Sequence, residues 1–71
     1  MMASFGFIDD THVISVSRGR HNLKIWDTTT GKVVDQVRKI NYAVIVLASD
    51  AIAHSCEVTH DVLRAYNLVL W

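Results

Sequence analysis

The sequence has a single cysteine, no proline and no long apolar run, and these shortages exclude whole classes of protein. One cysteine, Cys56, cannot form an intrachain disulfide, so a secreted disulfide-stapled mini-protein is excluded and a reducing cytoplasmic or nuclear setting fits better. The longest apolar run, Ala43 to Ala48, is far shorter than the ~20 residues of a membrane helix. The first five residues have no basic start and no long apolar core, so we expect no signal peptide.

An excess of charge of one sign is also absent. Seven Lys and Arg residues balance seven Asp and Glu residues in a chain of 71 residues. A neutral chain lacks the overall basic field of a nucleic-acid-binding protein, although a local patch remains compatible with neutrality. We therefore expect neither nucleic acid nor a membrane among its partners. The length allows one small domain at most, with a large share of its surface exposed.

The first half of the chain alternates apolar and polar residues with the period of two that is typical of β-strands. Four short segments show this pattern, at residues 5–7, 12–17, 23–26 and 33–37. Turn residues separate them, and in the last turn Gly31 can supply a positive φ. The pattern predicts a meander of four antiparallel strands.

The second half supports two interpretations. A spacing of 4-3-4-3-4 indicates an amphipathic helix with Ser49 or Asp50 as its N-cap; the residues so spaced are Ile52, Cys56, Thr59, Leu63, Tyr66 and Leu70. A gapless shift of 40 residues instead suggests an internal repeat. The matches in that one register include Ala3 with Ala43, Asp10 with Asp50, Ser15 with Ser55, Leu23 with Leu63, Trp26 with Tyr66 and Asp27 with Asn67. We favour the repeated meander and keep the C-terminal helix as the alternative.

The segment Leu23-Lys24-Ile25-Trp26-Asp27, followed by Thr30-Gly31-Lys32-Val33-Val34, resembles strand c, the turn and strand d of a WD repeat. Repeats of that family have about 40–45 residues, which agrees with the shift. The resemblance implies structural roles for Ser15, Trp26, Asp27 and Gly31, and for Tyr66 and Asn67 in a second repeat. The sequence departs from the family pattern in the first repeat, where Arg20 stands at a usual aspartate position, and no Gly-His pair precedes residue 43. The second repeat has Tyr66 in place of the tryptophan and lacks the turn glycine after Asn67.

The resemblance leads to an all-β fold: antiparallel four-stranded blade meanders of an incomplete WD-repeat propeller, about one and three-quarter repeats in all. Residues 1–40 would form the first blade and residues 41–71 a divergent, truncated second one. Because a propeller needs roughly 4–8 blades, we expect a fragment, or a piece completed by further blades in cis or in trans, with open edges that favour self-association. Trp26 would be the main apolar anchor, packed between blades. The implied function is that of a non-enzymatic protein-interaction scaffold or adaptor without a cofactor.

The binding candidates are basic. The blade geometry that the resemblance implies would bring loop residues of blade one to a single rim, namely Arg18, Arg20, His21, Arg38 and Lys39. Guanidinium groups match the geometry of carboxylate and phosphate, so such a rim could capture an acidic or phosphorylated protein segment. Ordinary solvated loop charge is the competing interpretation.

Two further functions stay open. The spacing of His54, Cys56 and His60 resembles part of a zinc site, although four ligands, or three and a water, are needed. A buried cysteine with histidines in nearby loops explains the same residues more simply. A C-terminal helix could instead dock Leu63, Tyr66 and Leu70 into the groove of a partner. No nucleophile elbow or glycine-rich phosphate loop indicates catalysis.

Overall fold

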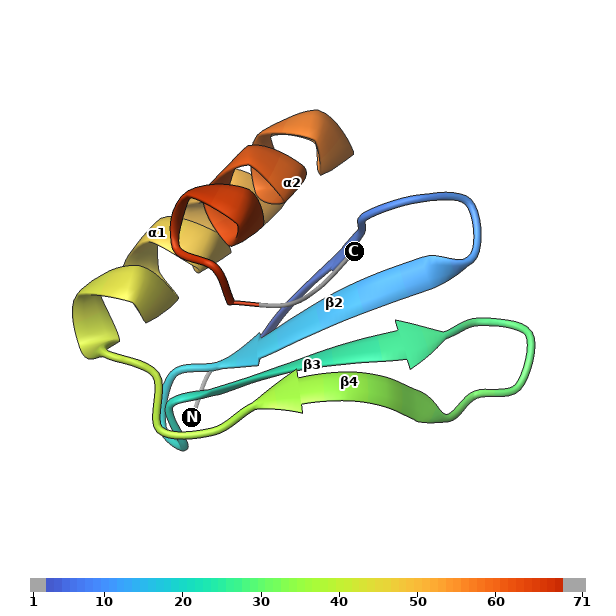
Figure 1. Ribbon diagram of the computed structural model, residues 1–71, viewed down its shortest axis with the longest axis horizontal. Helices are drawn as coiled ribbons and strands as arrows, with labels where there is room; N and C mark the ends of the chain where they lie inside the picture. The colour runs from blue at the N-terminus through green and yellow to red at the C-terminus, as the bar shows by residue number, and fades with distance from the viewer. Residues whose placement is uncertain (1–2, 69–71) are drawn as a thin grey trace.

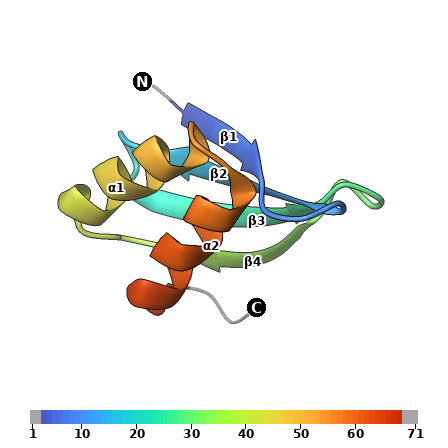
Figure 2. The ribbon, with the colours of Figure 1, turned by 90° about the horizontal axis from the view of Figure 1, so that it is seen from above.

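The computed structural model describes residues 3–68, which form one antiparallel sheet backed by two helices (Figure 1). The strands β1 (Ala3–Phe7), β2 (His12–Ser17), β3 (Asn22–Asp27) and β4 (Val33–Val37) pair in chain order. The helices α1 (Tyr42–Ile52) and α2 (Cys56–Ala65) follow, and both lie on the same face of the sheet, as Figure 2 shows from above. The predicted four-stranded meander is confirmed.

The turns of the meander are closed by short polar side chains. In the β1–β2 turn, Asp9 Oδ1 accepts the backbone N–H of Thr11 at 2.8 Å. In the β3–β4 turn, Asp27 Oδ1 accepts the backbone N–H of Thr29 at 2.7 Å, and Gly31 adopts a φ of 72°. This left-handed conformation is open to glycine at no steric cost, which confirms the role predicted for Gly31.

The core lies between the sheet and the helices. Alternate residues of the two central strands are completely buried there, with Ile14 and Val16 from β2 and Leu23 and Ile25 from β3. The helices contribute Ile45, Ala48 and Leu63 to the same cluster. Because successive side chains of a strand point to opposite faces, the residues between these buried ones project from the other side of the sheet.

No helix among residues 3–68 covers that other side of the sheet. At Gly6 the strand β1 lies so close to α1 that an added Cβ would be 2.6 Å from Ile52 Cγ2. Gly6 therefore faces the helices, and its neighbours Phe5 and Phe7 face away, where they are 69% and 60% exposed. We call this uncovered side the open face.

The all-β prediction is wrong, because the described part of the second proposed blade is helical. Asn41 caps α1, its side chain accepting the backbone N–H of Ala43 at 2.8 Å. The apolar run after it reads as a strand locally, but it buries Ile45, Ala48 and Ala51 at the three-residue spacing of a helix. Residues 43–47, which the repeat aligns with β1, thus lie in α1.

The alternative prediction of a C-terminal helix is confirmed in that the second half is helical, but its predicted bounds are wrong, because two helices replace the single one. Ser49, one of the two predicted N-caps, is buried inside α1. The second helix begins instead after Ser55, whose Oγ accepts the backbone N–H of Val58 at 3.1 Å. Leu70, which ends the predicted helical spacing, lies outside the described residues. Neither described helix combines the length and apolar character that crossing a membrane requires.

Candidate anion-binding groove

A groove of about 350 Å³ lies on the open face, over β3 and β4 at the end of the sheet that carries the β2–β3 turn. Every residue that lines it is cationic or an amide: Arg20, Asn22, Lys24, Gln36, Arg38 and Lys39. We call it the basic groove. No aspartate or glutamate of residues 3–68 lines it, so none of these side chains neutralises its cations within the groove.

Strand alternation places the floor of the basic groove. Asn22 and Lys24 alternate with the buried Leu23 and Ile25 on β3, and so project from the open face. Lys24 is the register partner of Gln36 on β4, which brings the two side chains side by side. The sequence pattern that predicted these strands therefore also determines which polar residues share a face.

Two turns supply the remaining cations, and a hydrogen bond holds these turns together. The backbone N–H of Ile40 donates to the carbonyl of His21 at 2.7 Å, which joins the β2–β3 turn to the chain that leaves β4. His21 and Lys39 both have positive φ, 52° and 58°. Residues other than glycine seldom adopt this conformation, and it persists only where the surroundings impose it. The bond between the turns brings Arg20 close to Lys39.

The electrostatics of the basic groove favour anions. Four of the seven Lys and Arg residues of the chain line it, so a neutral protein has a local cationic surface. The ammonium group of Lys24 also lies 5.8 Å from the centre of the Trp26 ring, within the range of a cation–π contact. That contact holds Lys24 over the open face, where Lys24 lines the basic groove.

The structure brings together three of the five predicted binding residues, Arg20, Arg38 and Lys39, and not the other two. Arg18 does not line the basic groove. The His21 ring packs at 5.8 Å from the ring of Tyr42. The sequence reasoning considered loop residues alone and so missed the three strand residues of the groove, Asn22, Lys24 and Gln36. The period of two in β3 and β4 could have found them.

Some of the residues to which the WD resemblance gives structural roles lie in the sheet, and others lie at the end of α2. Trp26 Nε1 donates to Ser15 Oγ at 2.8 Å across β2 and β3, which joins two of the residues to which the resemblance gives structural roles. Trp26 is half-buried on the open face and lies outside the buried core, so its predicted role as the main apolar anchor is wrong. Tyr66 ends α2 and Asn67 follows in a left-handed conformation, so neither occupies a strand.

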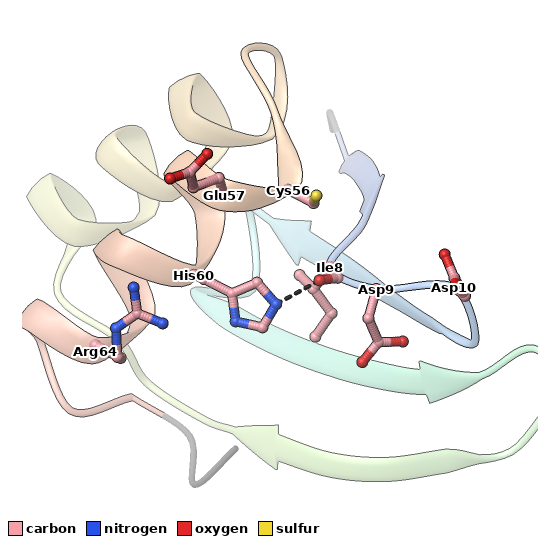
Figure 3. A pocket seen from close by; sticks show the side chains of 7 residues that line it. All are labelled: Ile8, Asp9, Asp10, Cys56, Glu57, His60 and Arg64. Atoms are coloured by element: carbon pink, nitrogen blue, oxygen red, sulfur yellow. Dashed lines mark hydrogen bonds between the residues drawn. The ribbon is translucent and has the colours of Figure 1, made fainter.

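The candidate zinc residues do not converge. His54 Nδ1 lies 2.7 Å from the carbonyl oxygen of Asp50 at the end of α1. Cys56 and His60 line a separate open pocket of about 490 Å³ between α2 and the β1–β2 turn (Figure 3). There the His60 ring bonds to the carbonyl of Ile8. Among residues 3–68, no three His, Cys, Asp or Glu side chains are grouped so as to hold a metal ion.

The basic groove is thus a surface that can donate hydrogen bonds and positive charge to a carboxylate or phosphate group, since its lining offers two guanidinium groups, two ammonium groups and two amides. Comparisons of the chain with protein-family models, with curated proteins and with solved structures found no match.

Proposed function

We propose that this protein is a non-enzymatic interaction module that captures an acidic or phosphorylated segment of another protein in the basic groove. The observation that carries the proposal is the composition of the groove: four cations, two amides and no acidic residue among its lining. Two of the cations, Arg20 and Arg38, carry guanidinium groups, which bind carboxylate and phosphate oxygens in pairs.

The expected affinity is modest and depends on salt. An exposed ion pair contributes about 0–1 kcal/mol, so four such pairs give a weak contact. Salt screens the attraction between exposed charges over about 8–10 Å at near-physiological ionic strength. Binding should therefore weaken steeply when salt is added.

Kinship with WD repeats is part of the proposal for residues 3–37 alone. The hydrogen bond from Trp26 to Ser15 and the turn closed by Asp27 and Gly31 support it. WD repeats serve mainly as surfaces for other proteins, which agrees with an interaction module. A cytoplasmic or nuclear location also belongs to the proposal, because Cys56 is an exposed free thiol, a state that reducing compartments preserve.

Fluorescence anisotropy of a labelled phosphoserine peptide tests the proposal. The double variant Arg20→Gln, Arg38→Gln removes the two guanidinium groups and should weaken binding by up to about thirtyfold, which corresponds to the loss of two contacts of about 1 kcal/mol each. Lys32→Gln is the control, since Lys32 is an exposed cation in the β3–β4 turn at the opposite end of the sheet. Equal loss in both variants, or binding that is indifferent to salt, would refute the proposal.

A further inference from the structure

The open face carries a second feature beside the basic groove, a cluster of apolar side chains, most of them aromatic, that extends from β1. Phe5 and Phe7 are the two most exposed large apolar residues of the described chain, at 69% and 60%. Val13 and Trp26 lie beside Phe7 in its cross-strand row. We call these four residues the aromatic patch. Apolar residues grouped on one surface commonly mark an interaction site.

The aromatic patch and the basic groove are joined by the register of the sheet. Phe5 pairs with Ser15, Ser15 with Lys24 and Lys24 with Gln36, so that one row runs from the patch into the groove. Neighbouring strands lie about 4.8 Å apart, which puts Phe5 and Lys24 about 10 Å from each other. In an extended peptide, side chains on one face recur about every 7 Å. A single peptide can therefore reach both features with residues two or four positions apart, whose side chains lie on the same face.

The charge distribution decides between a peptide and a nucleic acid. Turns at the end of the sheet next to Phe7 and Trp26 carry Asp9, Asp10 and Asp27 against one cation, Lys32. Five of the seven Lys and Arg residues lie toward the opposite end: Arg18, Arg20, Lys24, Arg38 and Lys39. A strand of nucleic acid has a phosphate at every nucleotide and would bring some of them toward the aspartates. A peptide with one anionic group and a neutral apolar side chain suits both ends.

We infer that the open face binds an extended peptide in which a phosphorylated or acidic residue lies two or four positions from an aromatic or large aliphatic residue. The anionic group occupies the basic groove, and the apolar side chain packs on Phe5 and Phe7. This inference rests on the proposed function and adds to it the spacing of the recognised motif. Binding of the peptide would bury Phe5 and Phe7, which are exposed in the free protein.

Three labelled peptides of equal length test the motif. The first has phosphoserine and, four positions on, phenylalanine. In the second the phenylalanine is replaced by serine, and in the third the phosphoserine is replaced by serine. The peptide with both residues should bind at least tenfold more tightly than either of the others. The protein variant Phe5→Ser, Phe7→Ser should abolish the gain from the peptide's phenylalanine and leave binding of the phosphoserine-only peptide unchanged. Tyr66→Ser is the matched control, because Tyr66 is 47% exposed at the end of α2.

Each outcome has one meaning. If the phosphoserine-only peptide binds as tightly as the full motif, and Arg20→Gln, Arg38→Gln weakens both equally, the motif is refuted and the proposed function stands. If that double variant changes no affinity, the proposed function fails as well. A single-stranded oligonucleotide that binds more tightly than the full motif, and loses affinity in the Phe5→Ser, Phe7→Ser protein, would replace the peptide by a nucleic acid. Since the motif is varied in the peptides as well as in the protein, an unfolded variant cannot mimic these results.

Discussion

The close approach of β1 to α1 at Gly6 gives a prediction about stability that can be worked out from one distance. A Cβ at this position would lie 2.6 Å from Ile52 Cγ2 and 3.5 Å from Ile52 Cβ, whereas carbon atoms prefer about 3.5–4.0 Å. Gly6→Ala therefore forces the sheet and the helix apart, and overpacking of this kind costs about 1–3 kcal/mol. Alanine also lowers the conformational entropy of the unfolded chain, which stabilises the folded state by about 0.4–1 kcal/mol. We expect a net destabilisation of about 1–2 kcal/mol.

Urea unfolding followed by circular dichroism measures this effect. With a slope of about 1 kcal/mol per molar urea for so small a protein, the midpoint should fall by about 1–2 M. Ile52→Ala removes the clashing methyl group, so the double variant should be more stable than the sum of the two single effects allows. Ile52→Val retains Cγ2 and should give no such rescue. A neutral or stabilising Gly6→Ala would show that β1 and α1 are farther apart than described.

Three further predictions concern single contacts. Trp26→Phe and Ser15→Ala should each cost about 0.5–1.5 kcal/mol, and a double-mutant cycle should show that the two losses are not additive, because both remove one hydrogen bond of 2.8 Å; additive losses would contradict the bond. Ser55→Ala should cost about 0.5–2 kcal/mol and reduce the helical dichroism signal through loss of the N-cap, and an unchanged signal would argue against that cap. The backbone N–H of Thr11 holds the pKa of Asp9 below its usual 3.8, so Asp9 stabilises the fold above the unfolded-state pKa and this stabilisation is lost as the pH falls through the lower folded-state value; Asp9→Asn should lessen that acid sensitivity in pH-dependent melting, and equal acid profiles would refute it.

The sequence predicts the meander because each of its signals is local. Alternation over a few residues, followed by turn residues such as Gly31, is sufficient to define a strand and its end. The same alternation determines which side chains face the core, so the burial of Ile14 and Val16 can be predicted from the sequence. The gathering of Arg20 with Arg38 and Lys39 follows from the meander itself, since antiparallel neighbours bring the two turns to one end of the sheet.

The structure of the second half is harder to predict because the local helical spacing and the apparent repeat of the strand pattern conflict. The run from Ala43 to Ala48 is apolar throughout, and such short runs do not distinguish a strand from a buried helix. What decides for helices is the capping by Asn41 and Ser55 together with packing against the sheet, which supplies most of the stability of a short helix. A gapless match of two segments carries no information about that packing.

Backbone amide NMR during titration with the phosphoserine–phenylalanine peptide shows directly whether the basic groove binds an anionic segment. We expect little change along α2 and the largest shift changes at Phe5 and Phe7 of the aromatic patch and at the groove residues, namely Arg20, Asn22, Lys24, Gln36, Arg38 and Lys39. Addition of salt should reverse the changes at the groove first. Shift changes centred on α2 and the β1–β2 turn, with the groove residues unmoved, would contradict binding in the groove.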